Sequence, residues 1–455
     1  MSRNRLLFGV FVVLLTLSLL LTACAPKTVM VPVEKTVEVK VTVPVKETVE
    51  VTVEVPAPKG AITVMGVWGG DERVAFQDAV APFTKETGIG VAFEGTRDLA
   101  AVLTTRVEAG NPPDIAILPN PGQLYELAKA GHLVPLDSFM DVEKIKADYG
   151  QSWVDLASYD GHLYGIFYKV AIKSLVWYNP KAFAAKGYQV PKTWDEMMAL
   201  TDQIVADGGT PWCIGLESGP ASGWPGTDWI EDIMLRTAGP EVYDQWVRHE
   251  IPWTDPAVKQ AWEFFGQIAR NDKYVWGGVQ GVLNTNFGDS PQPLFDDPPG
   301  CYMHRQASFI TGFFPKGLKA GEDYDFFTFP PIDEQWGTPA LIAGDVIVMF
   351  NDTPEVRQFV QHLASAKPQE IWAASGGFIS ANKQVNLDVY PDDLTRKMAQ
   401  AIVSAQVARF DGSDLMPAAV GAGSFWTGVL DYVSGTDLDT VLADIEASAQ
   451  DAYGK

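Results

Sequence analysis

The sequence predicts an α/β protein with two lobes. Strand and helix patterns alternate from residue 61 onward, which is typical of a mainly parallel sheet covered by helices. The part from 61 to 455 is also long enough for two lobes with separate cores. The composition fits a globular chain, because 47% of the residues are hydrophobic and 20% are charged.

The alternation begins with an apolar–polar pattern over 61–68, as in a strand. A helical stripe of apolar residues follows: Phe76, Ala79, Val80 and Phe83. Four more elements are predicted, namely a strand near 90–93, a helix near 98–109, a strand at 114–118 and a helix at 123–130. Ligands of such sheets bind beyond the carboxyl ends of the strands, so we expect the loops at 68–72 and 119–123 to line a site.

Two cap signals and one amphipathic pattern predict three further helices. Thr193 and Glu196 form a capping box, and the helix that they begin should end near Asp207. Thr353 followed by a proline marks the start of another helix. Residues 436–449 have the pattern of a closing amphipathic helix.

The N-terminal residues 1–23 have the features of a secretory signal peptide. Arg3 and Arg5 precede an apolar run over 6–21, which at about 16 residues is shorter than the ~20 of a membrane-spanning helix. The run ends in Leu21-Thr22-Ala23-Cys24, which resembles the bacterial lipobox, whose cysteine is lipidated and becomes the mature N-terminus. We therefore expect a lipid anchor at Cys24; the alternative is an ordinary cleavage site with a chance cysteine.

Residues 24–60 contain a near-repeat with a period of 12, in which 31–39 recurs as 43–51. The valines alternate as in a strand, but prolines interrupt the run and the other positions are charged or threonine, so nothing nearby would bury them. We interpret this segment as an extended tether between membrane and folded part. A β-hairpin that docks on the folded part is the alternative.

The net charge restricts the class of ligand, and the cysteine content predicts a disulfide. The formal net charge is −23, and cleavage before Cys24 removes two arginines to leave −25, which argues against nucleic acid as a ligand. Cys213 and Cys301 remain as an even pair in a compartment that permits oxidation, and a disulfide is the preferred interpretation. Two independent buried thiols are the alternative.

Several stretches together resemble the bacterial extracellular solute-binding proteins for oligosaccharides, the maltose- and α-glucoside-type lipoproteins of ABC importers. They occur in the family's order over roughly residues 60–455: FTKETGIGVAFEG, GNPPDIAILPN, LAKAGHLVPLD, GHLYGI, VWYNPKAFAAKGYQVPKTWDEM and GGFIS. The resemblance implies two α/β lobes joined by three crossing segments, with a sugar held in the cleft between them. It places hinges near 169–174, 336–344 and 378–383.

On this basis residues 61–171 and 344–382 form the N-terminal lobe. Residues 172–336 and 383–455 form the C-terminal lobe, and 337–343 is a hinge crossing. A ligand that contacts both lobes would stabilise the closed form, and the closed lobes would then engage an ABC permease.

The sequence offers no positive evidence for catalysis, a cofactor or a metal. Its five histidines form no His-Glu-x-x-His, and there is no Cys-x-x-Cys or Gly-x-Ser-x-Gly. Gly421-Ala-Gly423 begins like a dinucleotide loop, but Trp426 stands in place of the third glycine. Glu231 and Asp232 are adjacent on a predicted helix, about 100° apart, and so do not face each other as a glycosidase pair.

Sugar sites combine flat aromatic rings with carboxylates, amides and arginine. The residues that offer this mixture, several of them through the resemblance, are Trp68, Asp71, Glu72, Asn120, Gln123, Trp224, Asp228, Trp229, Arg305, Gln306, Asp345, Phe378 and Trp426, with Phe309 as a further possibility. Each has an alternative: the tryptophans as core residues, Arg305 in a surface salt bridge, Asp345 in a turn. The prolines at 119 and 121 depart from the better-known maltodextrin binders, which weakens any transfer of exact substrate.

The predicted function is a monomeric, lipid-anchored, extracytoplasmic receptor that binds a neutral oligosaccharide, an α-glucoside or other disaccharide, and delivers it to an ABC permease. The candidate loops carry mostly Asp, Glu and Trp, which favours a neutral ligand over a sugar acid or glycerol phosphate; a polyol is a further alternative. An extracellular carbohydrate-active enzyme and a surface adhesin are the alternatives from other classes.

Overall fold

The computed structural model describes residues 60–404 and 407–454, without the side chains of 403 and 404. Cys24, the predicted signal peptide and the predicted tether lie outside the described residues, apart from Gly60, and stay predictions. Within the described part, none of the helices combines the length and the apolar character needed to span a membrane.

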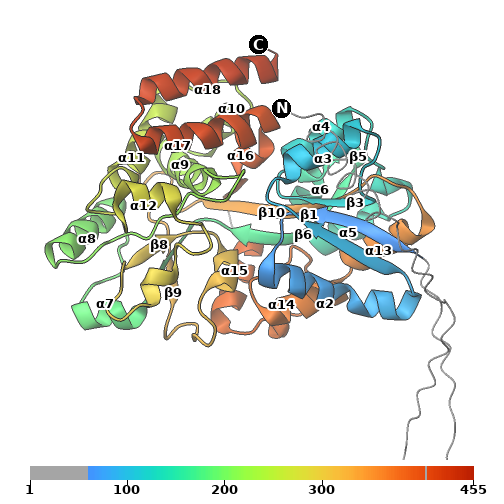
Figure 1. Cartoon of the computed structure of the whole chain (residues 1–455), viewed down its shortest axis with the longest axis horizontal. Coiled ribbons are helices and arrows are strands. Elements are labelled where there is room, and N and C mark those ends of the chain that lie inside the picture. Colours follow the sequence, from blue (N-terminus) through green and yellow to red (C-terminus); the bar gives the residue numbers. More distant parts are fainter. Residues whose placement is uncertain (1–59, 405–406, 455) are drawn as a thin grey trace, which may run out of the picture. The chain divides into compact units, whose positions relative to one another are not determined.

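A mixed sheet organises the first group of elements (Figure 1). Its strand order is β11-β10-β3-β1-β2, and β6 pairs with β10 as well. β1 is parallel to β2 and β3, whereas β10 is antiparallel to β3 and β6. The strands are β1 (Ala61–Gly66), β2 (Gly90–Gly95), β3 (Ile115–Leu118), β6 (Gly165–Ile172), β10 (Ala340–Met349) and β11 (Ala408–Phe410). The predicted α/β alternation is confirmed, and β10 introduces the antiparallel pairings.

Helices cover both faces of this sheet. The predicted apolar stripe of α2 (Gly70–Thr87) is buried as expected. In the view of Figure 1, α2 and α14 lie below the sheet, and α3, α4 and α6 lie above it. The remaining members of this group are α3 (Leu99–Glu108), α4 (Pro121–Lys129), η1 (Leu136–Ser138), α5 (Val142–Tyr149), α6 (Gln151–Leu156), β4 (Ser158–Tyr159), β5 (His162–Leu163), α13 (Pro354–Ala364), α14 (Ala366–Ser375), η4 (Leu387–Val389) and α15 (Asp393–Ser404).

The second group is built from helices around a small antiparallel sheet. Its central strand β7 (Leu175–Tyr178) pairs with β8 (Met303–Arg305) and β9 (Asp325–Thr328). The helices are α7 (Pro180–Lys186), α8 (Trp194–Ala206), α9 (Trp224–Thr237), α10 (Pro240–Val247), α11 (Pro256–Ala269), α12 (Gly278–Asn284), α16 (Gly412–Leu415), α17 (Trp426–Ser434) and α18 (Leu438–Tyr453). Short turns are η2 (Gln292–Phe295), η3 (Ser308–Phe313) and the π-helical η5 (Val420–Phe425).

The predicted caps are confirmed. Thr193 Oγ1 accepts from the Glu196 N–H at 3.2 Å, and the Glu196 side chain reaches back to the Lys192 N–H at 2.7 Å. Thr353 Oγ1 caps α13 by accepting from the Val356 N–H at 3.3 Å. The expected closing helix is α18.

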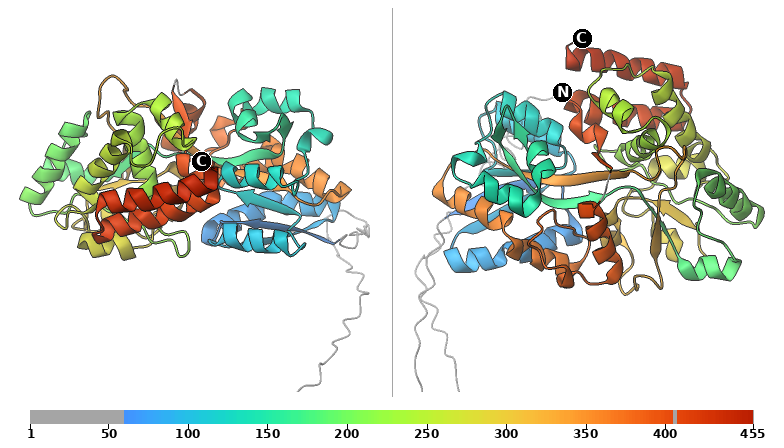
Figure 2. Two further views of the ribbon diagram at one scale, coloured as in Figure 1. Left: turned by 90° about the horizontal axis from the view of Figure 1, so that it is seen from above. Right: turned by 180° about the vertical axis from the view of Figure 1, so that it is seen from behind.

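Two hydrophobic cores correspond broadly to the two groups. Seen from behind in Figure 2, β6 and β10 run side by side from the first group to the second. Leu394, Met398 and Ile402 of α15 belong to the first core, and α15 contacts β6. The first core also contains Trp177 and Cys213, so core membership does not define the lobes. The lobe boundaries stay predictions.

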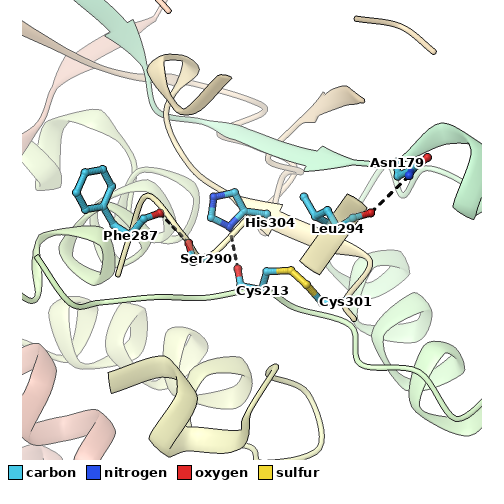
Figure 3. The surroundings of a disulfide bond; sticks show 7 residues. All are labelled: Asn179, Cys213, Phe287, Ser290, Leu294, Cys301 and His304. Atoms are coloured by element: carbon cyan, nitrogen blue, oxygen red, sulfur yellow. Dashed lines mark hydrogen bonds between the residues drawn. A yellow bond between two sulfur atoms is a disulfide. The ribbon is translucent and has the colours of Figure 1, made fainter. Parts of the chain in front are cut away.

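The predicted disulfide joins Cys213 to Cys301, with 5.6 Å between their Cα atoms (Figure 3). It connects the segment before α9 to the start of β8. His304 lies beside it and contacts the Cys213 carbonyl oxygen through Nδ1 at 2.9 Å. Burial lowers the pKa of His304 to about 4, so this histidine is neutral at physiological pH.

Candidate functional site

A cavity of about 280 Å³ lies between the two groups of elements. One side, here called the first wall, consists of lining residues within 67–123, 169–171 and 343–345. The other side, the second wall, consists of Lys173 and lining residues within 218–228, 309 and 413–426. The first wall includes the turns that follow β1, β2 and β3, which is where an α/β sheet is expected to bind its ligand.

Eight of the thirteen predicted sugar contacts line this cavity: Trp68, Glu72, Asn120, Gln123, Trp224, Asp228, Asp345 and Trp426. Phe309 lines it as well. They come from segments that are as many as 358 residues apart in the sequence. The fold therefore places side chains in one cavity that the sequence predicted only as separate loops.

The first wall contains an indole–carboxylate pair and an ion-pair cluster. Trp68 Nε1 donates to Asp345 Oδ2 at 2.8 Å. Burial raises the pKa of Asp345 to about 6, although the neighbouring Lys169 ammonium opposes the rise. Lys169 itself forms an ion pair with Glu72, and Arg97 lies 3.8 Å from the same carboxylate. Lys169 and Arg97, the two cations of this wall, therefore share the carboxylate of Glu72.

The second wall is organised around the buried Lys173. Its ammonium contacts Asp228 Oδ1 at 2.8 Å and forms an ion pair with Asp411. It also lies 5.5 Å from the centre of the Trp224 ring, within the range of a cation–π contact. Burial lowers the pKa of Lys173, but the carboxylates of Asp228 and Asp411 outweigh this and raise it well above its usual value. Lys173 is therefore a permanent cation.

Asp228 is held between two cations. Lys173 contacts Asp228 Oδ1, and Arg305 Nη1 lies 3.7 Å from the other carboxylate oxygen, Oδ2. Burial raises the pKa of Asp228 to about 7, with Lys173 lowering it and Asp411 raising it. This carboxyl consequently changes its protonation near neutral pH.

Five polar atoms of cavity-lining residues are buried without a hydrogen-bond partner among the described residues: Asn120 Oδ1, Gln123 Oε1, Ser218 Oγ, Asp228 Oδ2 and Trp426 Nε1. Buried polar atoms are normally hydrogen-bonded, and an unpaired one costs free energy. Gln123 Nε2 donates to the Ala100 carbonyl oxygen at 3.4 Å, which fixes the amide. Two amide oxygens, one carboxylate oxygen, one hydroxyl and one indole N–H of cavity-lining residues are thus unpaired in this arrangement of the walls.

The close approach of two chain segments positions Trp426. Gly223 precedes α9 with φ +109°, a conformation that favours glycine, and a Cβ atom there would lie 2.8 Å from the Trp426 carbonyl carbon. Trp426 follows the π-helical turn η5, and Trp224 follows Gly223 directly. Any larger residue at 223 would separate the two tryptophans of the second wall.

The other five predicted contacts lie outside the cavity lining. Trp229 is a core residue, 1% exposed, and packs edge-on against Trp212 and Phe329. Phe378 is also buried, with its ring centre 5.1 Å from that of Trp372. Asp71 is exposed and pairs with Lys316 at 3.1 Å.

Arg305 and Gln306 are buried just behind the second wall. Arg305 Nη2 donates to Asp232 Oδ2 at 3.0 Å, so Arg305 is a buried ion-pair partner rather than the surface salt bridge of the alternative interpretation. Gln306 Oε1 accepts from the Ala307 N–H at 2.8 Å.

The cavity is also lined by five residues that were not predicted as site residues: Arg97, Asp98, Lys169, Lys173 and Asp414. A signal for the lysines was present: Lys169 and Lys173 are four residues apart within an apolar run, and a charge in a buried strand is rare unless it is paired. Their partners are distant in sequence, so the pairing itself could not be predicted. Among the described residues, no three His, Cys, Asp or Glu are placed to hold a metal ion.

A cavity between two α/β groups, lined by aromatic rings and free hydrogen-bonding atoms, defines a ligand receptor. The chain matches the family of bacterial extracellular solute-binding proteins over residues 78–400 and belongs to that family. It is therefore a binding protein and not an enzyme.

Two relatives are similar over most of their length. The osmoprotective compounds-binding protein GgtB of Synechocystis sp. is 50% identical over 387 residues, which are 85% of this chain and 92% of GgtB. The alpha-glucosides-binding periplasmic protein AglE of Rhizobium meliloti is 45% identical over 401 residues, 86% of each chain.

Solved structures confirm the fold class. The bacterial solute receptor AcbH superposes with a TM-score of 0.76 at 21% identity, over 87% of this chain and 99% of that one. RafE in complex with raffinose gives 0.70 at 20% identity, over 86% and 99%. At these identities the likeness concerns the fold alone.

Proposed function

We propose that this chain is an extracytoplasmic receptor that binds a neutral α-glucoside in the cavity and delivers it to an ABC permease. The five unpartnered atoms of the cavity-lining Asn120, Gln123, Ser218, Asp228 and Trp426 carry this proposal. Sugar hydroxyls would donate to the amide and carboxylate oxygens, and a ring or hydroxyl oxygen would accept from the indole N–H. Trp224 and Trp426 would contact the apolar C–H face of the sugar.

The charges of the cavity support a neutral ligand. Lys169 and Lys173 each form an ion pair with a carboxylate, and Arg97 shares the carboxylate of Glu72. Asp98 and Asp414 line the cavity and form no ion pair with any described cation. An anionic ligand would therefore have to displace an existing partner in a site with an excess of carboxylates.

The volume of the cavity and the similarity to a relative restrict the class of ligand further. The cavity volume of about 280 Å³ lies just below the ~300–1,000 Å³ of typical ligand cavities, which favours one or two sugar rings over a long chain. The relative at 45% identity is named for α-glucosides. A ligand that contacts both walls would favour their approach, since it binds better to the closed arrangement than to the open one.

Calorimetric titration of the mature chain tests this. We expect saturable binding of at least one of trehalose, maltose and sucrose, with weaker binding of the β-linked cellobiose and none of glycerol 3-phosphate. Asp71→Ala is the matched control, because Asp71 lies outside the cavity lining and should leave the affinity unchanged. Binding of the anion alone, or slow release of glucose, would sink the proposal.

We further propose that the mature chain is a monomer tethered to the membrane through lipidated Cys24. The support is the lipobox-like Leu21-Thr22-Ala23-Cys24 directly after an apolar run. Metabolic labelling with palmitate should modify the wild type and not Cys24→Ser, which should appear in the soluble fraction. Equal labelling of both would place the anchor elsewhere.

A further inference from the structure

Helix α9 carries four ionisable residues that are buried almost completely: Asp228, Glu231, Asp232 and Arg236, each 0–1% exposed. Their spacing puts them along neighbouring faces of one helix. Charged groups are rarely buried unless each is paired and hydrogen-bonded, so the partners of this charged face need to be identified.

The partners lie on three different stretches of chain. Asp228 binds Lys173 at 2.8 Å, and Asp232 Oδ1 accepts from Ser174 Oγ at 2.7 Å. Arg236 donates to the Pro339 carbonyl oxygen at 3.0 Å. Glu231 accepts from the backbone N–H groups of residues 412 and 413, both at 3.0 Å.

These stretches are here called the linking segments and comprise residues 173–174, 339–342 and 411–413. They adjoin the ends of β6, β10 and β11 and are hydrogen-bonded to one another. The Lys173 N–H donates to the Leu341 carbonyl oxygen at 2.7 Å, and the Asp411 N–H donates to that of Ile342 at 2.8 Å. Leu341 belongs to the second core and Ile342 to the first, so the chain passes from one core to the other here.

The same helix also reaches the ligand cavity. Trp224 and Asp228, in its first two turns, line the cavity. Asp228 Oδ1 binds Lys173 of the linking segments, whereas Oδ2 has no hydrogen-bond partner among the described residues. One carboxylate therefore connects the cavity directly to the segments between the cores.

We propose that the buried charged face of α9 couples ligand binding to the arrangement of the two cores, with Glu231 and Asp232 as positioning residues. This rests on the proposed function, because it requires a ligand that closes the two walls. A ligand that contacts Asp228 in the cavity fixes the Asp228–Lys173 pair. Glu231 and Asp232 fix α9 relative to 411–413 and 173–174. Buried charge pairs keep their strength only in a narrow geometry, so they favour one arrangement of the segments.

Glu231→Gln and Asp232→Asn test the coupling at residues that do not themselves line the cavity. Both oxygens of each carboxylate accept hydrogen bonds, so an amide nitrogen in either place faces a donor. Glu446→Gln is the matched control. Glu446 also accepts from a backbone N–H, that of Trp253 at 2.8 Å, and from Gln450 Nε2 at 2.9 Å, but it lies on α18.

The readouts are the dissociation constants of trehalose, maltose and sucrose by calorimetry and the ligand-induced decrease in radius of gyration by X-ray scattering, on the full mature chain. We expect Glu231→Gln and Asp232→Asn to weaken binding roughly 5- to 150-fold and to reduce the decrease in radius at saturating sugar. Glu446→Gln should keep both readouts at wild-type values, even if urea unfolding shows that it is equally destabilised.

The outcomes separate the two proposals. If the wild type binds and contracts while all three variants behave alike, the coupling is wrong and the sugar-receptor function stands. If the wild type binds none of the sugars, the proposed function fails and the coupling fails with it. Should Asp232→Asn not fold, Glu231→Gln decides by the same comparison.

Discussion

The two walls of the cavity offer hydrogen bonds of different kinds. The free acceptors of the first wall are the neutral amides of Asn120 and Gln123. The unpaired acceptors of the second wall are the hydroxyl of Ser218 and the carboxylate of Asp228, which is held between Lys173 and Arg305. Bonds to an ionised group are roughly twice as strong as neutral ones, but their strength depends on protonation.

The difference indicates a division of roles. The amide contacts of Asn120 and Gln123 do not change with pH, so these two residues can recognise hydroxyl positions at any pH. The second wall combines a titrating carboxylate, two tryptophans and a buried charge network that reaches the linking segments. The ligand contacts that are stronger and more sensitive to pH therefore lie on the second wall, which α9 connects to the linking segments.

The largest expected effect concerns the stability of the second group. The Cys213–Cys301 bridge closes a loop with a sequence separation of 88, so the double substitution by serine should lower the free energy of unfolding by roughly 4–5 kcal/mol. The sugar affinity should stay within about twofold, because the Cys213 N–H donates independently to the Met303 carbonyl oxygen at 2.8 Å. Urea unfolding and calorimetry measure the two effects; a large loss of affinity would show that the bridge, and not the charge network, positions the second wall.

The second prediction separates a ring that lines the cavity from a ring in the core. Trp426→Ala should weaken sugar binding roughly 10- to 100-fold, through loss of one ring contact and one indole hydrogen bond, with little change in stability. Trp229→Phe is the control, because Trp229 is buried against Trp212 and should affect stability rather than affinity. Fluorescence titration and thermal unfolding distinguish them. Equal affinities for Trp426→Ala and the wild type would remove Trp426 from the site.

Much of the fold was predictable, because each signal was local. The stripe from Phe76 to Phe83, the Thr193 cap and the Cys213–Cys301 pair depend on spacing or on counting cysteines. The charge network was not predictable. Lys173 meets Asp228 and Asp411 across 55 and 238 residues, and no local pattern encodes such a pairing.

The candidate site followed the same rule. Loops at strand ends, such as those with Trp68 and Asn120, could be placed because an α/β sheet gathers its strand ends. Asp345 lies inside β10 and not in the turn of the alternative interpretation. Trp229 could not be told from Trp224, five residues earlier on the same helix. Residues five apart on a helix point about 140° apart, so one faces the cavity and the other the core, and a sequence with apolar residues on both faces does not say which.

The smallest effect tests the difference between the walls directly. Asp228 has a pKa of about 7, raised mainly by burial, with Lys173, Arg305 and Asp411 as its charged neighbours. A hydroxyl donor prefers the carboxylate, so binding should lower this pKa, and affinity should fall as the pH drops through about 7. We expect a decrease of about tenfold between about pH 8 and pH 5.5, the difference between a charged and a neutral hydrogen bond.

Two substitutions assign this pH dependence. Asp228→Asn should lower the affinity at pH 8 and flatten the profile, apart from a smaller step near pH 6 where Asp345, the partner of Trp68, is protonated. Gln123→Ala should weaken binding by a few-fold, the loss of one neutral hydrogen bond, and keep the wild-type profile. Calorimetry across the pH range gives each curve. If Gln123→Ala flattens the profile and Asp228→Asn does not, the walls have been assigned the wrong way round, and the carboxylate held by Lys173 is a structural group alone.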